Sequence, residues 1–358
     1  MEGGTTTGPI AYRLKALTDL WTGDRSGNPS RLITTGLLGS IRWWFEVLVR
    51  GLDDSARDGT PVSAQGATRS VLVRGLGGSA RDPSNAQARC PDRQGRRCVV
   101  CELFGCTSWA RKFRFDVLGP DGKPQQQQIQ RGGAFSLAFT PLRPIRSEEW
   151  ALLDATIRLI ADYAAIGGKT VYKPSDESNR QNAAHHRDYG IVSIEQPANV
   201  EPVGLERLKA YVRDRRWRQV EHGDFAWVSL GNFWCIKDKY LTRAGPRKCS
   251  FNRVLGRKED KSIKERKGRH VVRWSDRFVN ENDDASRWIA GGRGESKKVF
   301  SFKTPARTFG FIKPGAVTRD DIRERLEAAW GRGSVGDNDL LTGTVIMEKL
   351  FRGQEKGS

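Results

Sequence analysis

The sequence predicts an α+β protein built from two ferredoxin-like (RRM-like) units with long insertions. Three observations in the first half support this fold class. Apolar and polar residues alternate in short segments, two other segments carry an apolar face at helical spacing, and the order of these segments is β-α-β-β-α-β. Period-two alternation is typical of half-buried strands, and apolar residues three and four apart are typical of amphipathic helices. Their order is that of a ferredoxin-like unit.

Six elements make up the predicted first unit. They are a strand over 10–20, a helix over 36–50, strands over 112–118 and 133–142, a helix over 147–165 and a strand over 191–195. The helix over 36–50 is the clearest, because Leu37, Ile41, Phe45 and Leu48 share one face. We assign residues 1–200 to this first domain.

A tandem near-repeat interrupts the first domain. VLVRGLDDSARD at 47–58 returns as VLVRGLGGSARD at 71–82. The unit is too short for a solenoid repeat. We interpret 51–74 as an inserted surface loop, because lengthening such a loop costs little entropy.

The second domain, 201–358, is less regular and is predicted to be a degenerate ferredoxin-like unit. Its predicted elements are a basic helix over 205–218, a strand pair within 225–236 around Gly231-Asn232, a mobile basic arm over 247–270, strands within 299–312, a helix from the Thr318–Asp321 capping box to Trp330, and a last element over 340–350. A capping box marks a helix start, and the glycine at 331 marks its end.

The charge balance points to a polyanionic partner. The chain has 61 Lys and Arg against 42 Asp and Glu, a formal charge of +19. Phosphate contacts dominate non-specific affinity for nucleic acid, and +19 exceeds what solubility requires. A basic surface kept only for solubility is the alternative. The sequence has no apolar run long enough to span a membrane and no signal-peptide pattern at 1–9, so we expect a cytoplasmic protein.

Four cysteines form the strongest candidate metal site. Cys90, Cys98, Cys101 and Cys106 follow a C-x7-C-x2-C-x4-C pattern. In a reducing compartment close cysteines favour metal over disulfide, and four thiolates suit a closed, structural zinc site. The alternative is that Cys106, which follows Leu103 and Phe104, packs in the core as a free thiol.

Three segments are candidates for RNA contact. Glycines and a serine at a helix start present backbone N–H groups to an anion, paired glycines allow close backbone approach, and basic residues on a strand reach phosphates. The candidate residues are Gly39, Ser40 and Arg42 in GLLGSIR, Gly167, Gly168 and Lys169 in the glycine-rich loop, and Arg111, Lys112 and Arg114 at the strand over 112–118. We expect Lys112 and Arg114 to share one strand face. The alternatives are close helix packing and an ordinary helix C-cap.

Two long motifs resemble a known family. GLLGSIRWWFEVLVRG, followed by CVVCELFGCTSWARKFRF, resembles the first RAMP subunit of the Cmr (type III-B CRISPR) effector complex. The Gly-Gly-Lys-Thr loop at 167–170 is similar to the glycine-rich loop of that family. The resemblance covers roughly residues 10–200. Two features depart from the family pattern: the insertion at 51–74, and the polar segment with His185 and His186 that follows the loop.

This resemblance implies a non-catalytic RNA-binding subunit with two ferredoxin-like folds. Such a subunit joins other RAMP subunits of the complex and contacts the 3′ part of the crRNA guide, the target RNA, or both, in antiviral defence. The rival function is RNA cleavage, because some related subunits use an aspartate in the loop after the first strand, where Asp19 and Asp24 lie. A generic RNA-binding protein is a further alternative.

Overall fold

The computed structural model describes residues 5–6, 8–22, 30–54, 90–167, 174–180, 183–218, 225–245, 248–259, 278–280, 282–291 and 296–351. Several predicted features lie outside these residues: most of the 51–74 insertion, Asp24, Gly168, Lys169 and the 260–270 part of the basic arm.

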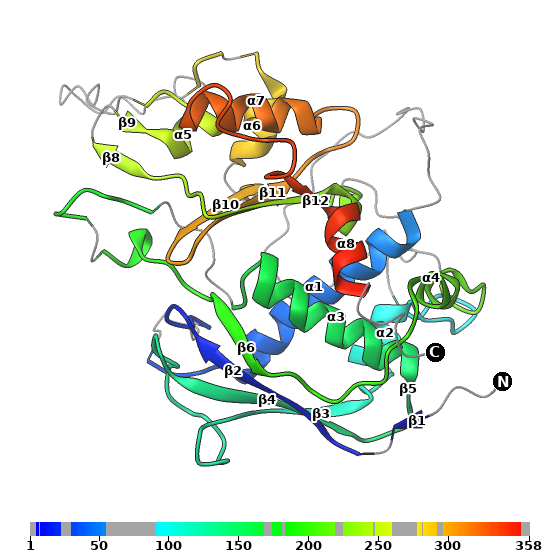
Figure 1. Ribbon diagram of the computed structural model, residues 1–358. Helices are drawn as coiled ribbons and strands as arrows, with labels where there is room; N and C mark the ends of the chain where they lie inside the picture. Colours follow the sequence, from blue (N-terminus) through cyan, green and yellow to red (C-terminus); the bar gives the residue numbers. More distant parts are fainter. Residues whose placement is uncertain are drawn as a thin grey trace.

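Two four-stranded sheets and their helices stack in alternating layers (Figure 1). One sheet lies at the bottom of the view, and helices α1 (Thr34–Asp54) and α3 (Ser147–Tyr163) lie on it. The second sheet covers these helices from the other side and carries its own helices on its far face. Helices α1 and α3 are therefore enclosed between the two sheets.

The first sheet confirms the predicted β-α-β-β-α-β unit. Its strands are β2 (Ile10–Ala16), β3 (Phe113–Leu118), β4 (Ala134–Pro141) and β6 (Val192–Gln196). They lie in the order β3-β4-β2-β6, and every pair is antiparallel. The burial of β2 alternates strictly, because one face of the sheet packs on the helices and the other faces outward.

The second sheet has the same topology. Its strands are β7 (Phe233–Lys237), β10 (Val299–Lys303), β11 (Ala306–Phe311) and β12 (Leu341–Thr342). Their order, β10-β11-β7-β12, repeats the second-third-first-fourth arrangement of the first sheet. Helices α5 (Ser250–Val254), α6 (Asp284–Ala290) and α7 (Arg319–Trp330) lie on its far face. The chain thus contains two ferredoxin-like units, as the sequence predicted.

The remaining elements are short. They are β1 (Thr5–Thr6), α2 (Val99–Phe104), β5 (Ile145–Arg146), η2 (Ala184–His186), α4 (Leu205–Arg213), η4 (Leu230–Asn232), β8 (Arg243–Gly245), β9 (Lys248–Cys249) and α8 (Gly343–Phe351). The longest of them are helices α4 and α8, with nine residues each. Helix α8 packs on η4 and α3, and therefore ties the end of the described chain to the first unit.

An aromatic cluster joins the two units. Trp44 of α1 lies 5.7 Å from Phe233 and 5.9 Å from Phe309, measured between ring centroids. Its indole N–H donates to the carbonyl of Ala165 at 2.9 Å. Edge-to-face aromatic pairs at such distances stabilise the fold beyond the effect of the apolar area that they bury. One continuous hydrophobic core therefore spans both sheets.

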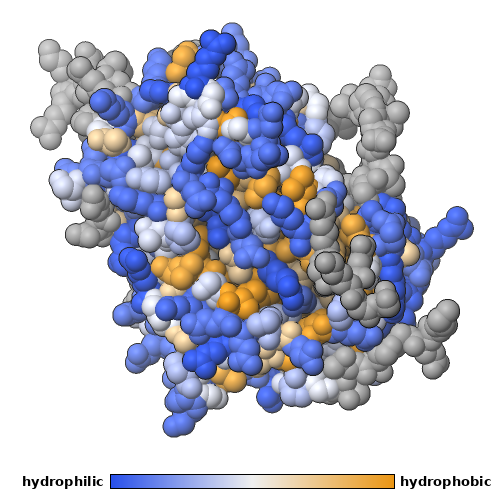
Figure 2. All heavy atoms as spheres, viewed as in Figure 1, coloured by the Kyte–Doolittle hydropathy of each residue, from blue (hydrophilic) through white to orange (hydrophobic). Residues whose placement is uncertain are grey.

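The surface seen in Figure 2 is mostly hydrophilic. Hydrophobic residues gather toward the centre of this face, over the helix layer between the two sheets. Within the described residues, no helix is long and apolar enough to cross a membrane.

Two predictions for the second half were wrong. The segment 225–236 holds one strand, because 230–232 forms a 3-10 turn in which Ser229 Oγ accepts the N–H of Gly231. The segment 248–259 is not a mobile arm: α5 buries Phe251 and Val254 in the outer core, and apolar burial outweighs the local charge. The predicted helix over 205–218 ends at Arg213.

Candidate metal centre and nucleic-acid interface

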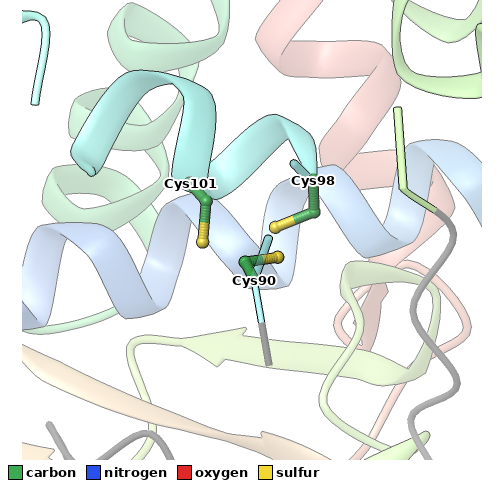
Figure 3. A group of neighbouring side chains, drawn as sticks. All are labelled: Cys90, Cys98 and Cys101. Carbon is green, nitrogen blue, oxygen red and sulfur yellow. The ribbon is translucent and has the colours of Figure 1, made fainter. Parts of the chain in front are cut away.

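Three of the four predicted cysteine ligands converge. The sulfur atoms of Cys90, Cys98 and Cys101 all lie within 4.8 Å of one another. Figure 3 shows Cys98 and Cys101 projecting from α2 and its start toward Cys90. Sulfur atoms around a tetrahedral zinc ion are separated by about 3.8 Å. The donor set therefore fits a thiolate metal site with little adjustment.

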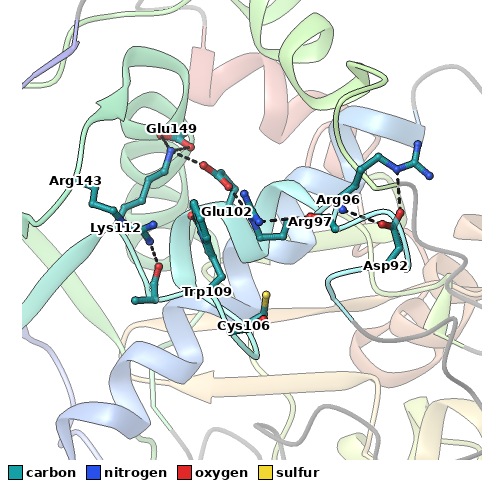
Figure 4. Close-up of polar contacts among 12 residues, drawn as sticks. Asp92, Arg96, Arg97, Glu102, Cys106, Trp109, Lys112, Arg143 and Glu149 are labelled. Atoms are coloured by element: carbon teal, nitrogen blue, oxygen red, sulfur yellow. Dashed lines mark hydrogen bonds and ion pairs between the residues drawn. The ribbon is translucent and has the colours of Figure 1, made fainter.

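A tight turn brings Cys90 back toward α2. The carboxylate of Asp92 accepts the N–H groups of Gln94 (3.0 Å) and Arg96 (2.8 Å), and it forms an ion pair with the Arg96 side chain (Figure 4). Gly95 has a φ of +75°, a left-handed conformation that glycine adopts without strain. The seven residues between Cys90 and Cys98 therefore fold back instead of extending.

Two arginines donate to the thiols. Arg42 on α1 lies 3.4 Å from Cys101 Sγ, and Arg218 lies 3.4 Å from Cys90 Sγ. Hydrogen bonds from Cys101 and Cys98, with a smaller contribution from Arg218, lower the pKa of the Cys90 thiol to about 2. The pKa of Cys101 is raised, because its thiol donates to Cys90 and is partly desolvated. The pKa of Cys98 is raised as well, so Cys90 is the thiol of the cluster that ionises most readily.

Cys106 is not one of the three mutually close thiols, although its thiol forms a hydrogen bond with that of Cys101. Its thiol donates to the Thr107 carbonyl at 3.7 Å, and it is half-buried, not packed in the core. It sits beyond Gly105, after the end of α2. The structure therefore brings Cys90, Cys98 and Cys101 of the predicted ligand set together and places Cys106 next to Cys101.

The residues expected to form an anion site at the start of α1 do not lie at the helix start. The helix begins at Thr34, so Gly39 and Ser40 lie in its second turn, where backbone N–H groups are already used within the helix. The Arg42 guanidinium donates to the Gly105 carbonyl at 2.8 Å as well as to Cys101. Arg42 therefore connects α1 to the cysteine segment in this structure.

Ser40 joins two predicted sites. Its hydroxyl accepts the N–H of Gly167 at 3.1 Å, across 127 positions of sequence. Gly167 has a φ of +109°, and a Cβ there would lie 2.9 Å from the Trp21 carbonyl. The second turn of α1 and the start of the glycine-rich loop are therefore in direct contact.

Replacing Ser40 with alanine should lower the free energy of unfolding by about 1 kcal/mol, because a half-buried amide loses its acceptor. The Gly167 amide should also exchange faster with deuterium. Chemical denaturation and amide exchange measure the two effects. The control is Ser136→Ala on the outer face of β4, which should change stability by less than about 0.5 kcal/mol. Unchanged exchange at Gly167 would contradict the contact.

Lys112 is not on the exposed face that the sequence predicted. Its ammonium forms buried ion pairs with Glu149 (2.8 Å) and Glu102 (2.9 Å). It precedes β3, so the strand alternation does not apply to it. Arg114 is exposed and paired with Asp116 at 2.7 Å, and Arg111 is half-buried beside Gly105. Lys112 and Arg114 therefore do not form a shared cationic face.

Trp109 anchors the cysteine segment to the first unit. Figure 4 shows its ring between two arginines: Arg97 lies 3.5 Å and Arg143 4.1 Å from the ring centroid. The indole N–H donates to the Glu102 carbonyl at 3.2 Å. Cation–π contacts of this kind contribute about 0.5–2 kcal/mol each. The stack fixes α2 against the chain that leads into β3 and out of β4.

Asp19 is a candidate catalytic residue for the rival function, RNA cleavage. Both of its carboxylate oxygens form polar contacts within the protein. One oxygen accepts the Arg131 backbone N–H at 2.9 Å, and the other forms a 2.6 Å ion pair with Arg187. These contacts fix the loop after β2. His186 lies in η2, in the polar segment after the glycine-rich loop.

Sequence reasoning missed two basic residues beside Asp19. Lys15 and Arg131 are exposed and line a groove where β2 ends. The alternation of β2 was the available signal for Lys15, because it turns Ala11, Arg13 and Lys15 to the outer face. No sequence pattern indicated Arg131, which lies in the connection before β4.

Comparison with known proteins agrees with this architecture. Residues 13–172 match the RAMP superfamily model, and this stretch contains part of β2, all of α1, β3, β4 and α3, and the cysteine cluster. The match lies within the part of the chain that resembles the first RAMP subunit, and it agrees with that resemblance at the level of the superfamily.

Two solved structures are similar to the chain. The apo crystal structure of Cmr1 from Pyrococcus furiosus is 11% identical, with 90% of this chain and 99% of that chain covered and a TM-score of 0.38. A chain of the Csm3–Csm4 subcomplex of the type III-A CRISPR-Cas interference complex is 14% identical, with 59% and 96% covered and a TM-score of 0.24. No curated protein sequence matches the chain.

Proposed function

We propose that this protein is a non-catalytic RNA-binding subunit of a type III CRISPR effector complex. It contacts the 3′ part of the crRNA guide, the target RNA, or both, and it assembles with other RAMP subunits. The observation that carries the proposal is the RAMP superfamily match over residues 13–172, which contain the two family-like motifs. The formal charge of +19 supports RNA as the partner.

The contacts of Asp19 support binding without cleavage. A catalytic carboxylate must reach the proton or the metal ion on which it acts. Both carboxylate oxygens of Asp19 instead hold Arg131 and Arg187 in place. The residue therefore shapes the loop after β2.

The cysteine cluster is proposed to hold a structural zinc ion. Cys90, Cys98 and Cys101 would supply the thiolates, and the guanidinium groups of Arg42 and Arg218 would offset their charge. The role proposed for zinc is structural: the ion would cross-link the segment before α2 to α2 itself. Through Arg42, the same centre stabilises the position of α1.

RNA binding by the purified chain should depend strongly on salt. The logarithm of the association constant for a single-stranded RNA should fall linearly with the logarithm of salt concentration, by about 0.7 for each phosphate neutralised. Fluorescence anisotropy over a salt series measures this slope. A slope near zero would contradict phosphate recognition.

The same RNA tests the rival function. It should remain intact during long incubation with Mg²⁺, and Asp19→Ala and Asp24→Ala should leave gel profiles unchanged. Cleavage by the wild-type protein that either substitution abolishes would show instead that the chain is a ribonuclease.

A further inference from the structure

A groove of about 340 Å³ lies where the two ferredoxin-like units meet. Its walls come from three segments far apart in the sequence: the end of β2, the connection before β4, and the turn between β10 and β11. In Figure 1 that turn lies close to the end of β2. The lining residues are Lys15, Ala16, Leu17, Arg131, Gly132, Thr304 and Pro305.

The groove has an almost wholly apolar lining, and two of the residues that contribute to it are exposed cations. Ala16, Leu17, Gly132 and Pro305 present only carbon and backbone atoms, whereas Lys15 and Arg131 are both exposed. Within the described residues, neither side chain has an acidic partner, although neighbouring Arg13 is paired with Glu195 at 3.3 Å. Unpaired cations beside an apolar surface suit a ligand with a phosphate and a flat ring.

Backbone hydrogen bonds hold the first two walls together. The Gly132 N–H donates to the Ala16 carbonyl at 2.7 Å, and the Ala16 N–H donates to the Gly133 carbonyl at 2.9 Å. Asp19 fixes the Arg131 backbone N–H from the other side. Lys15 and Arg131 are therefore presented from one rigid corner.

The third wall is fixed by the first unit. The carboxylate of Asp188 accepts the N–H groups of Lys303 (2.7 Å) and Thr304 (3.0 Å) at the β10–β11 turn. Lys303 also pairs with Asp176 through its ammonium. The groove is thus largely preformed, which reduces the entropy lost when a ligand is held.

We propose that this groove binds one nucleotide of single-stranded RNA. Its phosphate is held by Lys15 and Arg131, and its ribose and base lie against Leu17, Gly132 and Pro305. The volume is at the lower end of small-ligand sites, which suits a single nucleotide. The inference rests on the proposed function. It adds the position on the protein at which the RNA passes from one ferredoxin-like unit to the other.

The test uses the full-length chain and a fluorescein-labelled oligouridylate. The Lys15→Ala/Arg131→Ala variant should bind about tenfold more weakly, and its salt slope should be shallower by about 0.7 than that of the wild type, because one phosphate contact is lost. The matched control is Arg332→Ala, which removes an exposed charge after α7 and should leave both quantities unchanged. Ultraviolet cross-linking with mass spectrometry should place a uridine on 15–17, 131–132 or 304–305.

The outcomes separate the groove from the proposed function. If the wild type binds RNA but the double variant keeps its affinity and slope, or the cross-links map elsewhere, the groove does not hold RNA and the proposed function stands. If the wild type itself does not bind the oligouridylate, the RNA-binding function fails, and the groove proposal fails with it. If the double variant loses no more affinity than Arg332→Ala, the loss is a general effect of charge, and the groove proposal is wrong.

Discussion

Replacing Cys98 with serine should abolish zinc binding and unfold the segment that contains the cysteine cluster. The wild-type chain should carry about one equivalent of zinc, and the Cys98→Ser variant should carry nearly none. Binding to structural thiolate sites is worth about 10–16 kcal/mol at neutral pH, so its loss removes a large share of the local stability. Elemental analysis gives the metal content, and thermal unfolding gives the stability.

The control for this prediction is Cys106→Ser. Its thiol lies outside the three-thiol cluster, so this variant should keep its zinc and most of its stability. Metal content well below half an equivalent in the wild-type chain would contradict the zinc proposal. Loss of zinc from Cys106→Ser would show that Cys106 is a ligand, contrary to the geometry of the structure.

Replacing Lys112 with alanine should lower the free energy of unfolding by about 3–5 kcal/mol. Lys112 is the buried counterion of Glu149, whose side chain is only 1% exposed. Removing one partner leaves an uncompensated charge inside the protein, which is far costlier than losing an exposed pair. Tyr211 donates to Glu149 at 3.1 Å but cannot neutralise it. Urea denaturation measures the change.

Two variants show whether buried charge is the cause. Arg114→Ala breaks an exposed pair with Asp116 and should cost at most about 1 kcal/mol. In Lys112→Ala/Glu149→Gln both charges of the pair are removed, so the loss should be smaller than the sum of the two single losses. Strictly additive losses would show that Lys112 and Glu149 are not coupled.

The first unit could be predicted from sequence because its elements follow simple periods. The alternation in β2 and the apolar face of α1 are local signals that the tertiary structure does not override. The Thr318–Asp321 capping box likewise fixed the start of α7, where both reciprocal hydrogen bonds form. The second sheet could be anticipated only in outline, because β12 is two residues long and leaves almost no pattern.

The errors arose where long-range contacts decide the role of a charged residue. The sequence around Arg42 and that around Lys112 are both typical of phosphate binding. In the folded chain, however, Arg42 meets Cys101 and Lys112 meets Glu149, 59 and 37 positions away. The cysteine spacing predicted a cluster of thiols, and three of the four predicted thiols lie within 4.8 Å of one another. The basic groove was not predicted, because its walls join only after both units have folded.

Sequencing the RNA that co-purifies with the protein from its native cells tests the central proposal most directly. We expect enrichment of CRISPR guide RNAs, with the protected fragments biased to their 3′ part, and mass spectrometry should detect other RAMP subunits. Co-purified RNA with the composition of total cellular RNA, and no RAMP partner, would contradict it.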